Sequence, residues 1–480
     1  MGKELIGKPS HQPSILGSYA SDAVTFGRFV DEEGIGAKLR YGGPRNMLVF
    51  GPNGTGKGTK LLMPNLLQMA DRSIVVIDPK GELAAVTAPF RRTIGDVVII
   101  NPFGVLADRS GYEDLKSDGF NPLAALDPDK PSFNAEAAFL ADALVKIESN
   151  DPHWDSSAQS LVAATIMYVC IKARHSGNVP TLAEVREIIC EPMQKPDEDN
   201  GYVGKGVPAT AEKMMRIDHA GLRNKASQFA NWTSEVRSIA SDAKRQTESL
   251  DDDEIAADLA RGNFDFADIK KKPVTVYLIL PPDMMDRQSK WLRLVLTCAL
   301  RSVLRARGPG EPKVLFMLDE FASLGHLQII ETVWALVRGY GVQIMPVLQD
   351  LNQLKAIYKE RWETFIGNAG AVMSLGANDL TTARWMSDRA GETTRVVASY
   401  HSGSGHSTGG HGSSNSNEGL NWQQTKMPFV SPHKLFGLRD GVFYLWLAGL
   451  SDSVLGYAPG YFNIRQCCER ARQNPYFLRN

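Results

Sequence analysis

Residues 51–59, with the sequence GPNGTGKGT, have the composition and spacing of a loop that binds phosphate groups. Gly51, Gly54 and Gly56 allow backbone N–H groups to converge on phosphate oxygens. Lys57 would reach the β- and γ-phosphates of a nucleotide. The predicted nucleotide-binding residues are Gly51, Pro52, Asn53, Gly54, Thr55, Gly56, Lys57, Gly58 and Thr59. The competing interpretation is a glycine-rich turn with an incidental lysine.

One position departs from the usual pattern, which ends in Gly-Lys-Ser/Thr and uses the last hydroxyl to hold a magnesium ion. Gly58 stands at that position. Thr59 lies one residue later, which is roughly 100° further around a helix. Either Thr59 or a water molecule takes the place of the hydroxyl, or the loop binds its nucleotide with weak dependence on magnesium.

Two adjacent acidic residues, Asp319 and Glu320, follow the apolar segment VLFML. An acidic residue there can hold magnesium, directly or through water. The next glutamate can polarise the attacking water as a general base. The alternative is a solvated strand end, which the phosphate loop upstream disfavours. ATP and Mg²⁺ are the predicted cofactors, with Asp319 and Thr59 as metal ligands.

Two further residues are candidates for nucleotide chemistry. Gln349 ends the segment VQIMPVLQ, where an amide could sense the γ-phosphate or orient water. Arg338 lies between the acidic pair and this segment. An arginine that reaches a neighbouring subunit's phosphate contributes on the order of 10³–10⁵ in rate. The alternatives are a capping or surface glutamine and a surface-helix arginine.

Short apolar segments that alternate with helical patterns must position these residues. The predicted strands are 47–50, 73–78, 96–101, 274–280, 314–319, 342–348, 371–376 and 442–447. They are near-continuously apolar, as expected for strands covered on both faces. The alternation predicts an α/β fold with a mainly parallel sheet.

The strand pattern stops between about 125 and 265, where helical patterns take over. We expect an N-terminal extension at 1–40, a nucleotide-binding domain formed by 41–125 and 266–480, and an inserted all-α domain at 126–265. The stretch 401–419 is a Gly/Ser/His run, predicted to be a flexible loop because it cannot bury enough surface to order itself. A metal-binding tract using its histidines is the alternative.

Overall composition is that of an ordinary globular protein of 480 residues with a net charge of −1. This charge predicts neither nucleic-acid nor membrane binding, so any such surface must be a local patch. The longest apolar stretch, 161–171, is too short to span a bilayer, and the first residues do not form a signal peptide. The chain is predicted to be soluble as given. Its five cysteines lack metal-ligand spacing and suit a reducing cytosol.

Local basic patches occur at 205–245 and 287–307. They could contact nucleic-acid phosphates without sequence preference. The candidates are Arg293, Arg301 and Arg305 in the second patch, and Lys225, Lys244 and Arg245 in the first. Solvated helix faces are the alternative.

Several motifs in order resemble the type IV coupling proteins, the TraG/TraD-like ATPases of conjugation and type IV secretion, distant relatives of the FtsK-type DNA pumps. The motifs are GPNGTGKGT, VVIDPKGEL, NPFG, FNPL, HWDSSAQSLVAA, MLDEFASLGHL, RGYGVQIMPVLQDLNQL and GNAGAVMSLGANDLTTARWMSDRAGETT. The resemblance covers roughly 40–460. This family commonly has glycine after the loop lysine, so Gly58 fits.

The resemblance implies a RecA/FtsK-like P-loop NTPase fold. It implies that Lys57 binds phosphate, Asp319 and Glu320 form the acidic pair, Gln349 is the γ-phosphate sensor, and Arg338 is a trans finger. Members form hexameric rings on the cytoplasmic side of the bacterial inner membrane, next to the inner-membrane components of the secretion system. They recruit relaxase–DNA complexes or effector proteins, and their all-α domain is thought to face the substrate.

The motif DPKGE brings Asp78, Lys80 and Glu82 into the resemblance without a defined role. Lys80 either supports the nucleotide pocket or forms a structural salt bridge. The sequence departs from the family in two ways: most members carry N-terminal transmembrane helices, which are not present here, and the run at 401–419 is extra.

The leading functional hypothesis is a coupling ATPase that moves or hands over single-stranded DNA with its relaxase, or effector proteins. The second is a receptor that binds protein cargo and uses the nucleotide only as a switch. A third is a P-loop kinase for a small molecule, which requires a lid and an acceptor site that the sequence does not reveal.

Overall fold

The computed structural model describes residues 22–31, 33–147, 152–196, 204–262, 264–305, 312–406 and 414–477. Its centre is an 11-stranded sheet with the order β2-β1-β13-β12-β9-β3-β8-β7-β4-β6-β5. The strands are β1 (Val24–Asp31), β2 (Gly34–Tyr41), β3 (Met47–Phe50), β4 (Arg72–Ile77), β5 (Asp96–Ile100), β6 (Val274–Leu278), β7 (Lys313–Leu318), β8 (Val342–Leu348), β9 (Ala371–Ser374), β12 (Val442–Leu447) and β13 (Val454–Tyr457).

Neighbouring strands from β9 to β5 all pair in parallel. Strand β12 joins β9 in the antiparallel direction, and β13, β1 and β2 continue the sheet in that direction. The prediction of an α/β fold with a mainly parallel sheet is therefore confirmed, and each of the eight predicted strands is present.

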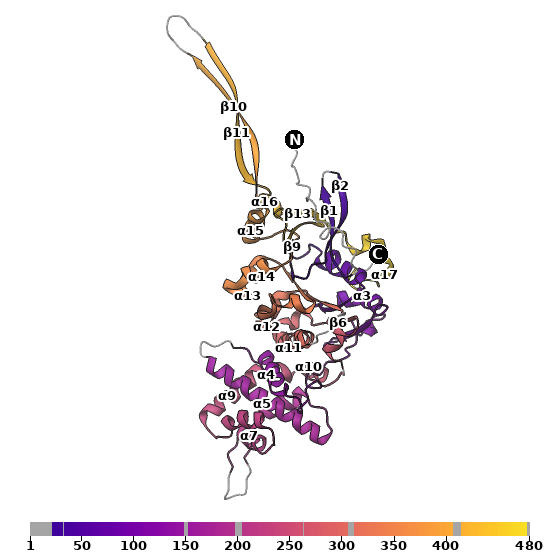
Figure 1. Cartoon of the computed structure of the whole chain (residues 1–480), viewed down its shortest axis with the longest axis vertical. Coiled ribbons are helices and arrows are strands. Elements are labelled where there is room, and N and C mark those ends of the chain that lie inside the picture. Colours follow the sequence, from indigo (N-terminus) through magenta and orange to yellow (C-terminus); the bar gives the residue numbers. More distant parts are fainter. Residues whose placement is uncertain are drawn as a thin grey trace.

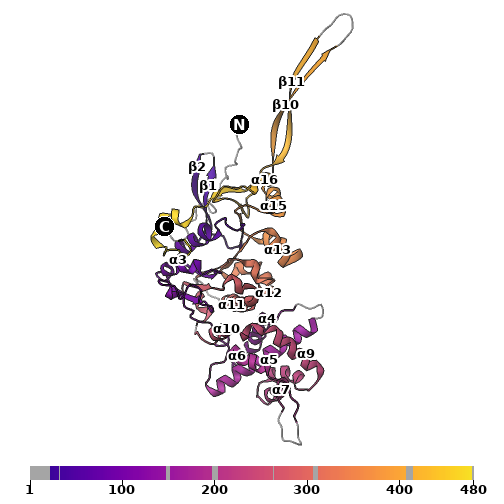
Figure 2. The same ribbon diagram turned by 180° about the vertical axis from the view of Figure 1, so that it is seen from behind.

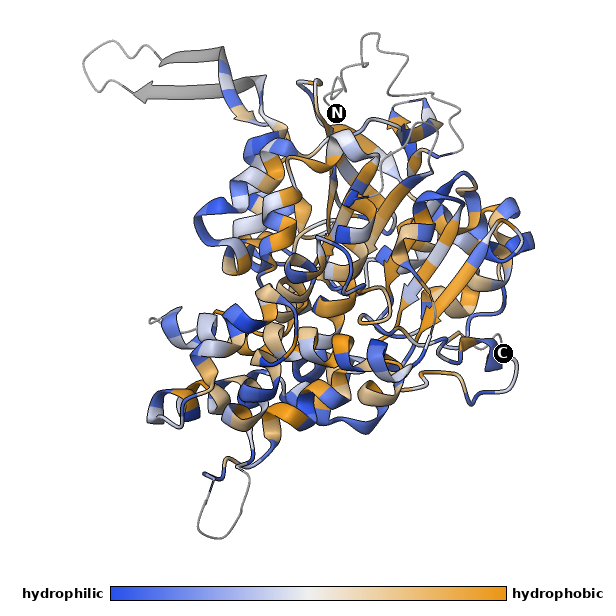
Figure 3. Ribbon diagram, turned by 60° about the horizontal axis from the view of Figure 1, so that its bottom comes forward, coloured by the Kyte–Doolittle hydropathy of each residue, from blue (hydrophilic) through white to orange (hydrophobic). Residues whose placement is uncertain are grey.

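Both faces of the parallel strands are covered, which explains their continuous apolar sequences. Successive residues of β7 enter different cores: Phe316 belongs to one hydrophobic cluster, and Leu315 and Met317 belong to the other. All residues of β3, β4, β6 and β8 are buried. Figure 3 shows apolar residues concentrated on the strands of the central sheet and on the helices beside it.

Three strands that the sequence did not predict extend the antiparallel side of the sheet. The first two, β1 and β2, contain glycines and charged residues, and both are only partly buried. The third, β13, has only 4 residues. None of them has the continuous apolar pattern that identified the buried strands.

Helices cover the sheet and form a separate pole of the molecule (Figures 1 and 2). Those near the sheet are α2 (Met63–Gln68), α3 (Glu82–Arg91), α11 (Met285–Arg305), α12 (Gln328–Val333), α13 (Leu351–Tyr358), α14 (Trp362–Asn368) and α17 (Arg465–Arg470). The pole contains α4 (Phe133–Leu144), α5 (Pro152–Ser176), α6 (Leu182–Cys190), α7 (Val207–Met215), α8 (Ala220–Ala226), α9 (Ser234–Gln246) and α10 (Asp253–Leu259). The helical character of this stretch agrees with the sequence, and the domain boundaries at 126 and 265 stay a prediction.

A two-stranded hairpin leaves the opposite end of the molecule (Figures 1 and 2). It consists of β10 (Glu392–His406) and β11 (Ser414–Pro428), beside α15 (Leu380–Ala390) and α16 (Pro432–Leu435). The predicted loop at 401–419 is therefore wrong for 401–406 and 414–419, where the backbone is paired. The pairing begins at Glu392, passes through the β-branched sequence TTRVV at 393–397 and extends from there into the glycine-rich part. Residues 407–413 lie outside the described residues.

Among the described residues, no helix combines the length and the apolar character needed to cross a bilayer.

Burial of β7 should contribute strongly to the stability of the fold, and the acidic pair follows this strand directly. The Phe316 side chain is fully buried. Phe316→Ala should lower the free energy of unfolding by about 3–5 kcal/mol, through lost apolar burial and the cavity left behind. Urea denaturation followed by tryptophan fluorescence measures this change. Phe462→Ala is the control, because the Phe462 side chain is 51% exposed; equal losses in both variants would contradict the assignment of β7 to the core.

Candidate nucleotide-binding site

The glycine-rich loop joins β3 to a helix, as the sequence predicted. Gly51 N–H donates to the Leu348 carbonyl over 2.9 Å, which ties the start of the loop to β8. The backbone then turns through positive φ values of 83° at Gly54 and 82° at Gly56, which glycine adopts without strain. Helical structure begins at Lys57 and continues into α2. Backbone N–H groups and a helix N-terminus thus meet at one place, which suits an anion.

The Lys57 side chain folds over this loop. Its Nζ donates to the Gly51 carbonyl over 2.7 Å and lies 3.5 Å from the Pro52 carbonyl. Burial lowers the pKa of Lys57, while the Glu320 and Asp319 carboxylates act in the opposite direction. Phosphate oxygens would offer this ammonium charged acceptors in place of neutral carbonyls, and charged hydrogen bonds are the stronger ones.

A side chain at position 58 would not clash with its surroundings, because a Cβ added to Gly58 would meet only Leu83 Cδ2, at 3.9 Å. The Thr59 hydroxyl lies at the base of the loop, with Oγ1 3.4 Å from the Gly56 carbonyl. Its role as a magnesium ligand stays a prediction.

The acidic pair follows β7, which is separated from β3 only by β8. Burial, followed by the neighbouring Glu320 charge, raises the pKa of Asp319 to about 6. Glu320 has φ 49°, a left-handed conformation that is uncommon for a residue with a side chain. Its N–H donates to Asp319 Oδ1 over 3.1 Å. Such strain persists where the surroundings fix it, and it is concentrated at functional sites.

Gln349 follows β8 and contacts the acidic pair directly. Its Nε2 donates to Glu320 Oε2 over 3.3 Å, and its backbone N–H donates to Gln353 Oε1 over 2.8 Å. The phosphate loop, Gln349 and Glu320 therefore lie at the carboxyl ends of three neighbouring parallel strands. Carboxylate and amide oxygens, such as those of Asp319, Glu320 and Gln349, are the ligands that Mg²⁺ prefers. The residues present therefore fit a magnesium–nucleotide complex.

Asp78 is a fourth charged group at this edge, for which the sequence suggested no role. Strand β4 pairs with β7 so that Ile77 lies opposite Leu318, which places Asp78 beside Asp319. Asp78 is 2% exposed, and its Oδ2 accepts from Ala84 N–H over 2.8 Å. Burial raises its pKa to about 7. Its place at the end of the apolar segment SIVVI was the available signal in the sequence.

Arg338 is not brought to this site within its own chain. It belongs to the 3₁₀ turn Val337–Tyr340, at the amino end of β8, whereas Gln349 follows the carboxyl end. Seven extended residues separate the two ends, about 23 Å at roughly 3.3 Å per residue. Only the backbone of Arg338 is described, so its role as a finger in trans stays a proposal.

The three basic candidates in α11 differ in whether their side chains are available to bind phosphates. Arg293 is 7% exposed, and its Nη1 donates to the Leu324 and His326 carbonyls over 3.3 and 2.6 Å. The prediction that it contacts nucleic acid is therefore wrong for this conformation, because the guanidinium supports the backbone after β7. Arg305 pairs with Glu136 over 2.6 Å. Arg301 stacks on the Phe139 ring, and burial lowers its pKa to about 10.

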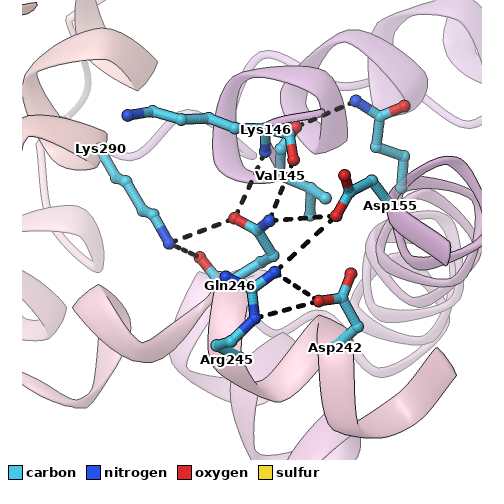
Figure 4. Close-up of polar contacts among 8 residues, drawn as sticks. Val145, Lys146, Asp155, Asp242, Arg245, Gln246 and Lys290 are labelled. Carbon is cyan, nitrogen blue, oxygen red and sulfur yellow. Dashed lines mark hydrogen bonds and ion pairs between the residues drawn. The ribbon is translucent and has the colours of Figure 1, made fainter. Parts of the chain in front are cut away.

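Three candidates lie in the helical pole. Arg245 contacts Asp242 over 2.6 Å and Asp155 over 3.8 Å (Figure 4), so its charge is already matched. The side chains of Lys225 and Lys244 are partly exposed. Within the described part of the chain, their ammonium groups make no hydrogen bond or ion pair. Lys225 and Lys244 are therefore the candidates that the structure leaves open to phosphates.

These features define a P-loop nucleotide-binding protein of the α/β class. The sequence matches the family described as "Type IV secretory system Conjugative DNA transfer" over residues 14–450, and the chain belongs to that family. The predicted resemblance to coupling proteins is thereby confirmed.

Among its relatives are a "Conjugal transfer protein TraG" from Escherichia coli, 27% identical and covering 78% of this chain, and a "Protein VirD4" from Rhizobium radiobacter, 26% identical and covering 77%. The matched regions are 59% and 51% of those two proteins, so the chain spans only part of their length. The solved coupling protein TrwBdeltaN70 has a TM-score of 0.64 at 18% identity, covering 92% of this chain and 89% of that one. TrwB in complex with ADP and Mg²⁺ has a TM-score of 0.59 at 17% identity, covering 87% and 85%.

Asp78 should give stability an unusual pH dependence. Its pKa is about 7 in the folded chain and about 4 when unfolded. Between these two pKa values the folded chain binds more protons than the unfolded chain. The free energy of unfolding therefore decreases as the pH rises from about 4 to about 7. Asp78→Asn lacks this titration, so it should lose less stability than the natural chain between pH 5 and about 8, measured by urea denaturation without magnesium or nucleotide.

Asp452→Asn is the matched control, because Asp452 is exposed. It should keep the pH dependence of the natural chain. Parallel curves for Asp78→Asn and the natural chain would contradict the raised pKa of Asp78.

Proposed function

We propose that this chain is the ATP-hydrolysing part of a type IV coupling protein, which recruits single-stranded DNA with its relaxase, or effector proteins, and moves or hands them to a secretion channel. The observation that supports hydrolysis most directly is the Glu320–Gln349 contact at the sheet edge that also holds the phosphate loop. A site that only binds a nucleotide needs no carboxylate aimed at this position.

In the proposed reaction, the loop N–H groups and Lys57 hold the phosphates in line. Glu320 accepts a proton from the attacking water, and Gln349 keeps that carboxylate and the water oriented. Asp319, with Thr59 as a further candidate, would hold Mg²⁺, which supplies charge neutralisation when bound. The burial that raises the Asp319 pKa also strengthens its attraction to a cation, because little solvent screens it.

The family supports the wider setting of the proposal. The relatives are named for conjugal transfer, and TrwB has been solved with ADP and Mg²⁺ and with ADPNP. We infer that this chain also uses ATP and Mg²⁺, forms a homo-oligomeric ring, proposed to be hexameric, and works at the cytoplasmic face of a bacterial inner membrane with the inner-membrane components of the secretion system.

A ring would explain the position of Arg338. Because it lies at the opposite edge of the sheet from its own phosphate loop, it can serve a nucleotide only if a neighbouring subunit presents one. Lys225 and Lys244 would contact DNA phosphates from the helical pole, and Arg301 and Arg305 would do so only if their contacts with Phe139 and Glu136 opened.

The second candidate function is a cargo receptor in which the nucleotide only switches the conformation. The groove between α4, α11 and α12 favours it. This groove has a volume of ≈ 410 Å³ and combines apolar walls, such as Leu304 and Ile329, with Arg301 and Arg305.

Loss of the loop lysine or of the general base should stop hydrolysis for different reasons. Lys57→Ala should abolish nucleotide binding. Glu320→Gln should keep binding but lower the rate on the order of 10²–10⁴-fold, the usual contribution of a general base. Steady-state phosphate release, with and without single-stranded DNA and across protein concentration, measures both effects.

Glu363→Gln, at an exposed position on α14, serves as the control and should keep the natural rate. Unchanged hydrolysis rates in both variants would contradict the assignment of Lys57 and Glu320 to the ATP-hydrolysing site. Cargo binding that survives Lys57→Ala, together with negligible hydrolysis by the natural chain, would favour the receptor.

Because Arg338 is proposed to act on the nucleotide of a neighbouring subunit, rings that contain two different variants test its role. Arg338→Ala alone should be inactive. When it is mixed with Lys57→Ala, some activity should return, because some interfaces then combine an intact loop with an intact arginine. The measurement is ATP hydrolysis by mixtures whose joint assembly is verified by size-exclusion chromatography with light scattering. Full activity of Arg338→Ala alone would identify a surface arginine instead.

A further inference from the structure

The turn after β4 carries a lysine that the proposed mechanism does not use. Because β4 runs parallel to β7, with Ile77 opposite Leu318, the residues that follow both strands emerge at the same edge of the sheet. Lys80 lies two residues beyond Asp78 in this turn. Gly81 then reverses the chain into α3 with φ 65°. Lys80 therefore approaches the site from the side of β4, whereas Lys57 approaches from β3.

The Lys80 side chain is exposed. Across the described ranges its ammonium makes no hydrogen bond or ion pair, so the structural salt bridge considered from the sequence is not observed. Its charge nevertheless acts on the site: after burial, Lys80 adds to the lowering of the Lys57 pKa, and it opposes the rise of the Asp319 pKa that burial causes. A solvent-exposed cation that influences both groups lies close to the place where phosphate charge would collect.

The backbone of this turn is held by the C-terminal segment 472–476. The Tyr476 hydroxyl donates to the Lys80 carbonyl over 2.7 Å, and Asn474 Nδ2 donates to Glu82 Oε1 over 2.6 Å. Arg472 Nε donates to the Ala85 carbonyl in α3 over 2.7 Å. These contacts hold the backbone of the turn and the start of α3 and leave the lysine side chain unengaged.

The segment is itself anchored to the body of the molecule. Arg109 Nη1 donates to the Pro475 carbonyl, and the Tyr112 hydroxyl donates to the Gln473 carbonyl, each over 2.7 Å. The turn therefore has a rigid support on each side: β4 before it, and the segment 472–476 behind it.

We propose that Lys80 is a second phosphate-binding lysine of the nucleotide site, which contacts oxygens of the terminal phosphate from the side opposite Lys57. This inference rests on the proposed ATP site. The β-phosphate lies within reach of the loop and Lys57, whereas the acidic pair, beside β4, lies where the terminal phosphate is transferred. A cation there stabilises the charge that spreads over the terminal oxygens during transfer. The segment 472–476 acts as its positioning element.

The experiment compares two nucleotides by titration of each variant with a fluorescent non-hydrolysable ATP analogue and with the matching ADP. Lys80→Ala should bind the ATP analogue on the order of tenfold more weakly, as expected for the loss of one charged hydrogen bond, and should bind ADP unchanged. Lys80→Arg, which keeps the cation, should recover most of the affinity for the ATP analogue.

Lys195→Ala is the matched control, because Lys195 is an exposed lysine of the helical pole. Equal affinities of Lys80→Ala and the natural chain for the ATP analogue, or an equal loss for ADP, would overturn the inference while leaving the proposed function intact. A natural chain that binds neither nucleotide would instead overturn the proposed function.

Tyr476→Phe tests the support of the turn with minimal change, since only the hydroxyl that donates to the Lys80 carbonyl is removed. It should show the same preference, with weaker binding of the ATP analogue and unchanged binding of ADP. Binding of both nucleotides identical to the natural chain would overturn the positioning role of the segment 472–476.

Discussion

The arrangement of the candidate site depends on parallel pairing of four neighbouring strands, β3, β8, β7 and β4. Parallel strands end at the same edge, so the phosphate loop, Gln349, the acidic pair and Asp78 are collected there although 271 positions separate Asp78 from Gln349 in the sequence. The pairing also requires cover on both faces, which accounts for the two apolar clusters and for the buried character of the strands. A shift in register between β7 and β4 would separate Asp78 from Asp319 and move the following turn away from the site.

Burial at this edge has an electrostatic consequence. Asp78 and Asp319 are carboxylates in a poorly solvated place, and burial is the main reason that their pKa values rise to about 7 and about 6. Desolvation of like charges opposes the compact state, so the fold keeps the two carboxylates by fixing them through strand pairing and backbone hydrogen bonds. The same cost makes the site receptive to cations, because a bound positive charge relieves it. The left-handed backbone conformation of Glu320 is a second energetic cost at the same site, and such strained conformations are concentrated at functional sites.

The sequence predicted the parts of the fold whose pattern is local. Buried strands are continuously apolar, so the seven parallel strands and the antiparallel strand β12 were all found. The glycine-rich loop between a strand and a helix carried its own signal. Strands β1 and β2 lack such a pattern because they are only partly buried and contain glycines and charged residues, and β1 joins the sheet through the distant strand β13. Arg293 shows the opposite failure: its place in a basic segment suggested a surface, but a helix position alone does not reveal that the side chain reaches the carbonyls after β7. The sequence placed Asp78 after an apolar segment and left the role of Lys80 open, because the proximity of both residues to the acidic pair depends on which strand pairs with β4.

Helix α11 joins this edge to the helical pole. It follows β6 and precedes β7 along the chain, and Lys290 on α11 donates to the Gln246 carbonyl at the end of α9 over 2.7 Å (Figure 4). Gln246 is fully buried, and its side chain also donates to the Lys146 carbonyl over 3.0 Å, so this residue connects α9, the segment that follows α4, and α11. The nearby Gln288 interrupts the helical backbone of α11 and donates to Asp252 over 3.1 Å. Because α11 also places Arg293 against the backbone that follows the acidic pair, the proposed function would allow a displacement of the helical pole by cargo to act on β7 through this helix. For the proposed function, α11 would provide a continuous covalent and hydrogen-bonded connection between the helical pole and the candidate nucleotide site.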